Sequence, residues 1–378
     1  MPDKDQVTQA ASLSEEGNPE ARHWPLTKAF LISGLTLFSV VLLVYGSEVL
    51  VPLVVALLLW FLINAIANIY QRLWSRWWGP LRGLSLFLAL LTMLAASLLA
   101  IVVVIENVSA MSESSTDFER SLNILLSQVS EFTGLKQEEM VAEIAEQLGL
   151  GKLLGSIVSA MTNFASAFGI VFVYVIFLLV EQQLFDRKLN AIIRDESRRQ
   201  QIRSLLDRVG RDIQSYLWIM GFVSLLTAGL SYPIMVAVGL EHASFWAFLI
   251  FILNFIPTVG SILATLIPSF YGLLQFADFR LFFILLVSIG IIQFLIGNVL
   301  QPRLSARRLN LSQFVVILSL FVWGAIWGVV GMFLAVPITA IMMIVFANFR
   351  STRVVAAILS ESGDVPPPNA KMDRRTLP

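Results

Sequence analysis

Residues 243–274 have the sequence ASFWAFLIFILNFIPTVGSILATLIPSFYGLL, an apolar stretch that is interrupted by Asn254, Pro257, Gly260 and Pro268. A membrane span needs about 20 apolar residues, so this stretch is too long for one untilted span. Proline removes a backbone hydrogen-bond donor and glycine relaxes a helix, which gives the stretch a natural breaking point near its middle. We predict a broken helical hairpin that enters a membrane and returns. The alternative is one long, kinked helix.

A second stretch has the same character. Residues 312–347, SQFVVILSLFVWGAIWGVVGMFLAVPITAIMMIVFA, are also too long for one span and are interrupted by Gly324, Gly328, Gly331 and Pro337. The pattern predicts a second broken hairpin, again with a kinked helix as the alternative. Gly324 and Gly328 form a Gly-x-x-x-Gly pattern, which favours close helix packing first and hinge motion second.

Composition indicates that most of the chain is surrounded by lipid. Hydrophobic residues make up 57% of the 378 residues and charged residues 14%, with a mean hydropathy of +0.79. Soluble domains average about 25% charged residues. The chain is therefore predicted to be an all-α, polytopic helical membrane protein with about six full spans, two broken hairpins and a small extramembrane helical insertion.

Changes in polarity along the chain predict its divisions. They are a disordered cytoplasmic tail (1–28), three transmembrane helices (29–105), an acidic periplasmic helical insertion (106–155), a fourth transmembrane helix (156–184), a basic cytoplasmic helix (185–212), a transmembrane core that contains both hairpins (213–348) and a second disordered cytoplasmic tail (349–378).

The distribution of arginine and lysine predicts the orientation. Basic loops stay in the cytoplasm, and four segments are basic: residues 72–82, 185–212, 303–308 and 350–353. If each of the last four apolar stretches crossed once, Arg303, Arg307 and Arg308 would lie outside, against their charge. Two returning hairpins place every basic loop inside. We therefore expect a multi-pass protein of a bacterial inner membrane with both termini in the cytoplasm.

Polar and conformationally special residues at membrane depth are the candidates for a substrate pathway. Asn254, Pro257 and Gly260 would form the tip of the first hairpin. Gln293, Asn298 and Gln301 recur on roughly one face of a helix, where they either contact a solute or join neighbouring helices. Trp323 and Trp327 lie one turn apart and either stack on a substrate or anchor at the interface. Pro302 and Arg303 follow at the cytoplasmic end, where Arg303 is interpreted as an anchor rather than a ligand.

Other chemistries have little support in the sequence. Glu181 is the best candidate for a carboxylate that couples transport to an ion, although a solvated boundary position is the simpler interpretation. Cysteine is absent and His23 and His242 are the only histidines, so we expect no metal and no cofactor. Gly149–Lys152 lacks most of a phosphate-binding loop, and no nucleophile–base pair is evident. Neither enzyme activity nor nucleic-acid binding is expected.

Four motifs, in order, resemble the signature of the autoinducer-2 exporter family of permeases: Asn254-Phe-Ile-Pro257-x-x-Gly260; Gly297-Asn298-Val-Leu-Gln301-Pro302-Arg303-Leu; Leu309-Asn-Leu-Ser312; and Trp323-Gly324-x-x-Trp327-Gly328-x-x-Gly331-Met-x-Leu-Ala-Val-Pro337. The resemblance covers about residues 28–348. It implies an eight-segment membrane protein with an extramembrane insertion after the third segment, assembled as a homo-oligomer and most readily as a pentamer.

Members of that family are described as exporters of the furanone-derived quorum signal, and others as exchangers of sodium or lithium for protons. The resemblance thus implies a secondary transporter that moves a small hydrophilic solute such as autoinducer-2 out across the inner membrane. Because intramembrane acids are scarce, the sequence gives less support to the alternative of a sodium(lithium)/proton antiporter. A second alternative is an oligomeric membrane scaffold or channel whose acidic insertion binds partners.

Overall fold

A computed structural model describes residues 19–74, 81–113, 120–121, 124–125, 127, 150–305, 310–349 and 351–363. These residues are helical apart from turns, short connections and one isolated β-bridge between Leu311 and Ser360. By length and composition, seven of the described helices can cross a membrane. The prediction of a polytopic helical membrane protein is confirmed. The chain divides into two compact units, Met1–Val51 and Pro52–Pro378, which are described separately.

The first unit contains helix α2 (Pro19–Tyr45) and the start of α3 (Ser47–Trp74). The two helices are separated at Gly46, whose N–H donates to the Leu42 carbonyl oxygen at 2.8 Å. The predicted disordered tail was wrong for residues 19–28, which are helical; Pro19 suits a first helical position because its missing N–H has no helical partner there. Residues 1–18 lie outside the described residues.

In the second unit, the remainder of α3 packs with α4 (Arg82–Glu113) and α7 (Leu150–Ile192). Small residues allow this close packing: Ala56 and Ala89 are fully buried and Ala67 nearly so. A hydrogen bond of 2.8 Å from Trp60 Nε1 to Gln182 Oε1 joins α3 to α7. The predicted acidic insertion falls largely on residues 114–149, most of which lie outside the described residues.

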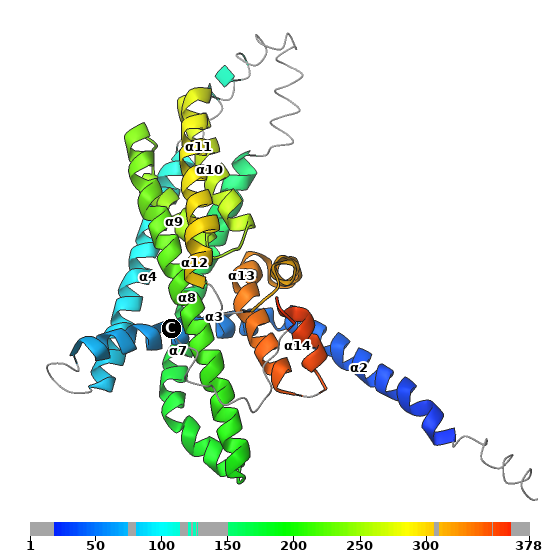
Figure 1. Ribbon diagram of the computed structural model, residues 1–378. Coiled ribbons are helices and arrows are strands. Elements are labelled where there is room, and N and C mark those ends of the chain that lie inside the picture. Colours follow the sequence, from blue (N-terminus) through cyan, green and yellow to red (C-terminus); the bar gives the residue numbers. More distant parts are fainter. Residues whose placement is uncertain are drawn as a thin grey trace, which may run out of the picture. The chain divides into compact units, whose positions relative to one another are not determined.

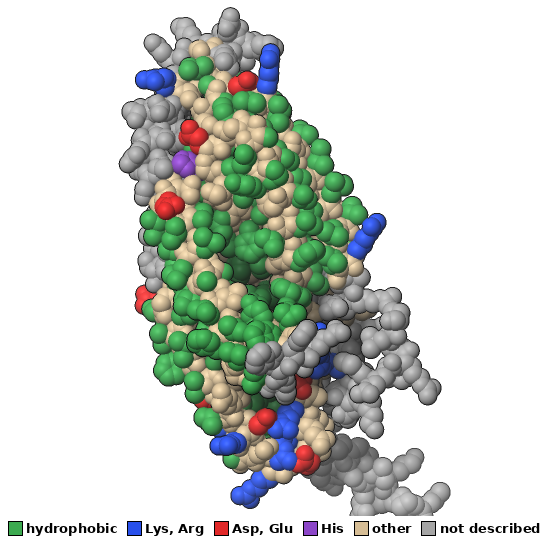
Figure 2. Space-filling view, turned by 90° about the vertical axis from the view of Figure 1, so that its left-hand side faces the viewer, with side chains coloured by type: hydrophobic (Ala, Val, Ile, Leu, Met, Phe, Trp, Pro, Cys, Tyr) green, Lys and Arg blue, Asp and Glu red, His purple; other side chains and the backbone are tan. Residues whose placement is uncertain are grey.

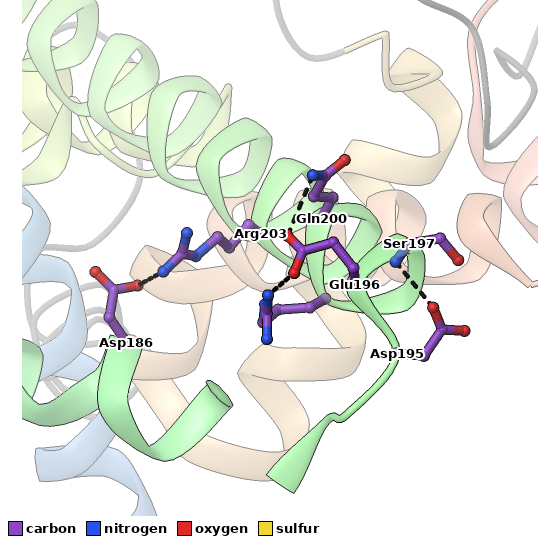
Figure 3. A network of polar contacts seen from close by, with 7 residues as sticks. Asp186, Asp195, Glu196, Ser197, Gln200 and Arg203 are labelled. Carbon is purple, nitrogen blue, oxygen red and sulfur yellow. Dashed lines mark hydrogen bonds and ion pairs between the residues drawn. The ribbon is translucent and has the colours of Figure 1, made fainter. Parts of the chain in front are cut away.

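The basic segment 185–212 is not one helix, so that prediction was wrong. Helix α7 ends at Ile192 and α8 (Glu196–Val238) begins after a three-residue turn. Asp195 caps α8 by accepting a hydrogen bond from the Ser197 N–H at 2.9 Å, which holds the pKa of its carboxyl below the usual value. An ion pair of 2.7 Å between Asp186 and Arg203 joins the two helix ends (Figure 3).

The first long stretch is a helical hairpin of α9 (Ala243–Leu253) and α10 (Val259–Phe276). Its tip is tight because a Cβ on Gly260 would lie 1.8 Å from the carbonyl oxygen of Leu253. Its base is closed by Gln275, which donates to the Gly239 carbonyl at 3.0 Å and accepts from the Glu241 N–H at 2.8 Å. The helix is interrupted between Leu253 and Val259, within the segment Asn254–Gly260.

The second long stretch, α13 (Gln313–Asn348), also reverses direction within its length. Gly328 has φ 63° and ψ −143°, a conformation that essentially only glycine adopts. A Cβ on Gly331 would lie 1.9 Å from the carbonyl oxygen of Trp323, eight residues earlier, whereas residues so spaced in a straight helix are about 12 Å apart. Gly324 lies against Met332 of the second arm, as close helix packing requires, whereas Gly328 is the turn and fits the hinge alternative.

The base of the second hairpin is closed by the C-terminal segment. After the short helix α14 (Arg353–Leu359), the Leu359 carbonyl accepts from the Ser312 N–H at 3.1 Å, and the Glu361 N–H donates to the Asn310 carbonyl at 3.0 Å. The predicted disordered tail was thus wrong for residues 351–363, because these backbone bonds and an apolar helix anchor them. Residues 364–378 lie outside the described residues.

Helix α8 packs against both hairpins. Its N-terminal half contacts the second arm of α13 through Ile213 and Leu334, and its C-terminal half contacts α9 through Met235 and Trp246. In Figure 1, α8 runs beside α9 and the rod formed by α11 (Phe279–Leu295), the π-helix η1 (Ile296–Leu300) and α12 (Gln301–Ser305). The hairpin tips meet where the ring of Phe255 stacks on that of Phe333, with centroids 5.0 Å apart.

Side chains on the surface are sorted by polarity. Figure 2 shows hydrophobic side chains over most of the middle of one face, whereas most charged side chains lie toward its two ends. Many large apolar side chains are exposed, among them Phe177, Phe283 and Phe321. Because water would oppose such exposure, this surface is suited to lipid.

We predict that Gly260→Ala and Gly331→Ala each lower stability by about 3 kcal/mol or more, because the new Cβ meets rigid backbone. The measurement is thermal unfolding of the purified protein in detergent. Gly229→Ala on α8 is the matched control: nothing lies within 4 Å of its Cβ position, so it should be neutral or stabilising by up to about 1 kcal/mol. Equal stability of all three variants would contradict the tip geometry.

Candidate functional site

A pocket of about 660 Å³ lies where the first hairpin tip meets α8, α11–α12 and the beginning of α13. The volume falls in the range of small-molecule sites, about 300–1,000 Å³. Its lining is drawn from segments that are far apart in the sequence. The lining residues are Met220, Asn254, Pro257, Thr258, Ser261, Ile262, Thr265, Leu266, Gly290, Gln293, Phe294, Gly297, Asn298, Gln301, Gln313, Val316 and Ile317.

The lining is uncharged and mixes apolar side chains with amides and hydroxyls. Its amides and hydroxyls can donate and accept hydrogen bonds, and none of its described residues is acidic, basic or a histidine. An unpaired ion in such a site would lose its hydration without a countercharge, which is costly. The pocket therefore suits a neutral solute with several hydroxyl or carbonyl groups.

The hairpin tip presents strained backbone to this pocket. The N–H of Val259 donates to the carbonyl of Pro257 at 2.6 Å across Thr258, which has φ 62° and ψ −62°. This is a γ-turn with positive φ, a rare and strained form. Strain of about 1–3 kcal/mol persists only where surrounding structure enforces it, and such residues concentrate at binding sites and moving elements.

A π-helical turn shapes the opposite wall. Along a regular α-helix, a spacing of five residues would rotate Asn298 by about 140° from Gln293. The wider turn of η1 compensates, so that Gln293, Asn298 and Gln301 all line the pocket. Gly297, on the same turn, has nothing within 4 Å of its Cβ position and leaves space in the wall. Single π-helical turns of this kind often occur at functional sites.

Gln293 is the most informative side chain of the pocket. It is 8% exposed, and its Nε2 has no hydrogen-bond partner among the described residues. An unsatisfied buried donor costs about 1–3 kcal/mol, so native proteins rarely retain one without a role. Two other pocket amides have partners for their N–H groups. Asn298 donates to the Phe294 carbonyl, and Gln301 Nε2 lies 3.8 Å from the Met220 sulfur.

The structure brings together five of the predicted pathway residues and leaves four outside the pocket. Asn254, Pro257, Gln293, Asn298 and Gln301 line it.

The other four have different places. Gly260 is buried behind the tip, and Pro302 is exposed on α12. Trp323 and Trp327 pack against each other at the second hairpin tip, with ring centroids 5.2 Å apart. Pro337, which was predicted as a hinge or packing residue and not as a pathway residue, is buried in the second arm of α13.

Glu181, the predicted coupling carboxylate, is remote from the pocket lining. It lies on α7, is about half exposed, and pairs with Lys188 at 2.5 Å. An exposed pair of this kind contributes little to stability and needs no role in transport. Arg303 is exposed on α12 and does not line the pocket either.

Several lining residues were missed from the sequence. Ser261 and Thr265 are four residues apart, which places them on one face of α10, and this spacing could have identified them. Gln313 comes from the base of the other hairpin, and no local pattern indicates that it reaches the pocket. Met220 is an apolar residue of a long span, and its position depends on the packing of α8.

Two helical hairpins that pack on α8, with an uncharged pocket at the tip of the first, are typical of a polytopic membrane transporter of the permease class. Residues 32–351 match the family described as the AI-2E family transporter. The chain belongs to this family.

Three relatives are described as transport proteins. The AI-2 transport protein TqsA of Escherichia coli is 26% identical over 84% of this chain and 91% of its own length. A candidate transport protein of Haemophilus influenzae is 31% identical over 68% of this chain and 78% of its own. A candidate transport protein of Borreliella burgdorferi is 33% identical over 53% of this chain. The match covers 55% of that relative, so this chain spans about half of its length.

We predict that Gln293→Leu raises stability by about 1 kcal/mol while it lowers transport, because it removes a buried donor that only a bound solute satisfies. Thermal unfolding in detergent measures the first effect and solute efflux the second. The matched control is Gln275→Leu, which removes two existing hydrogen bonds and should lower stability by about 1 kcal/mol. A destabilised Gln293→Leu would show that the native amide is already satisfied.

Proposed function

We propose that this AI-2E family transporter is a secondary transporter that exports a small, uncharged hydrophilic solute such as autoinducer-2 from a bacterial cell. The observation that carries the proposal is the uncharged pocket with its unsatisfied Gln293 donor. The name of the Escherichia coli relative, which is a protein of AI-2 transport, supports the choice of solute. The remaining pocket amides would exchange their hydrogen bonds with water for bonds to the solute.

The pathway residues of this proposal are Asn254, Pro257, Gln293, Asn298 and Gln301. The backbone of the hairpin tip adds peptide groups at Thr258, which can hydrogen-bond a hydroxylated solute. Trp323 and Gly331 support the site indirectly, because their close approach closes the second hairpin, whose Phe333 stacks on Phe255 of the first tip.

The antiporter alternative has less support. Exchange of sodium or lithium for protons requires a group that titrates or binds a cation within the membrane. The described pocket lining offers no carboxylate, and Glu181 is exposed and paired with Lys188. The scaffold alternative gives no role to the amides and hydroxyls that line the pocket.

The membrane and assembly also belong to the proposal. We place the protein in the inner membrane with both termini in the cytoplasm, on the basis of its basic loops. The family resemblance supports a homo-oligomer, with a pentamer as its form.

The test uses liposomes that contain the purified full-length protein and labelled autoinducer-2. We expect protein-dependent efflux that Gly297→Leu abolishes, because the new side chain fills the pocket from a position with open space. Gly229→Leu, a matched glycine on an exposed face of α8, should retain efflux.

Sodium-dependent proton movement in the same liposomes separates the alternatives. We expect none above empty liposomes. If such movement were present and were lost in Glu181→Gln, while autoinducer-2 efflux were absent, the antiporter would replace the exporter.

A further inference from the structure

Buried hydroxyl groups recur along one face of α8 and extend beyond the pocket in both directions. Tyr216, Ser224, Thr227 and Ser231 share this face because their spacings match the helical period. Met220, which lines the pocket, lies on the same face between Tyr216 and Ser224. Ser224, Thr227 and Ser231 are 0% exposed and Tyr216 is 6% exposed. We call these four residues the hydroxyl face of α8.

Three of these hydroxyls are unsatisfied within the protein. Buried serines and threonines in apolar helices usually donate to a carbonyl of the preceding turn. Ser269 and Thr227 do so, at 2.7 and 2.8 Å. In contrast, Tyr216 Oη, Ser224 Oγ and Ser231 Oγ have no hydrogen-bond partner in the part of the chain that the structure describes. A row of such groups on one helix face requires an explanation.

The two hairpins cover this face. Tyr216 lies in the apolar cluster that contains Leu334 and Ala340 of the second hairpin. The half of α8 that carries Ser224 and Ser231 packs against α9 of the first hairpin. The indole N–H of Trp246, on α9, is also buried without an acceptor among the described residues.

We infer that the hydroxyl face of α8 is a wall of the solute pathway, covered in the present conformation and exposed when the hairpins move away from α8. Hydroxyls without protein partners are satisfied there by water and by a hydroxylated solute. Each hairpin covers one end of the face, so separation of either would open it toward one side of the membrane. This inference rests on the proposed transport function and extends its path beyond the pocket.

The absence of cysteine from the sequence provides a clean background for the test. Single variants Ser224→Cys and Ser231→Cys, in the full-length protein in liposomes, are treated with a membrane-impermeant methanethiosulfonate reagent. Both thiols should react several-fold faster than that of Ala89→Cys. Ala89 is the matched control because it is 0% exposed and packs in the apolar cluster of α3, α4 and α7, which contains no residue of either hairpin. Asn298→Cys, exposed in the pocket, is the positive control.

Two results would overturn the inference. One is that Ser224→Cys and Ser231→Cys stay unreactive while Asn298→Cys reacts. The other is that Ala89→Cys reacts equally fast, which would indicate general loosening of the packing.

The labelling measures access of water and reagent and requires no knowledge of the solute. If the thiols react but autoinducer-2 efflux is absent, the proposed solute is refuted and the inferred pathway wall is supported. Efflux with unreactive thiols would refute the pathway alone.

Discussion

The structure depends on two close approaches of backbone to backbone, which are possible because Gly260 and Gly331 have no side chain. Each glycine lies against a carbonyl of the preceding helix and lets an apolar stretch reverse within a few residues. Reversed backbone at membrane depth exposes peptide groups that lipid cannot satisfy, so protein or a watery cavity must surround it. Helix α9 has 11 residues and extends about 16 Å, half of a bilayer core of about 30 Å. A hairpin of this length would reach about halfway across such a core, and its tip lines the pocket.

Both hairpins pack on α8, which joins them into one structure. Each hairpin contacts a different half of α8, and their tips meet at Phe255 and Phe333. Each is also closed at its base by polar contacts, at Gln275 for the first and at Ser312 for the second. Closed bases let a hairpin move as a unit, since its two arms are joined at both ends. Motion of one hairpin against a fixed α8 is a physical basis for opening the pocket to one side of a membrane.

The sequence predicted what depends on local chemistry. Proline and glycine located both breaks, and costly amides in apolar helices identified Asn254, Gln293, Asn298 and Gln301. Features that depend on tertiary packing were not predictable. The role of Gly328 as a turn, the π-helical turn that redirects Asn298 and the contribution of Gln313 follow from contacts between distant segments. The ordered C-terminal helix was missed because a polar, proline-rich sequence follows it, while its anchoring bonds come from residues 310–312.

The central claim is that residues 243–274 leave a membrane on the side from which they entered. It is tested most directly by thiol labelling from each side of the membrane with four single variants: Glu241→Cys, Arg280→Cys, Arg194→Cys and Arg303→Cys. All four positions are exposed, and the native chain has no cysteine. The account predicts that positions 241 and 280 are labelled from one side and positions 194 and 303 from the other. Labelling of position 280 from the same side as 194 would show a single crossing and contradict the hairpin.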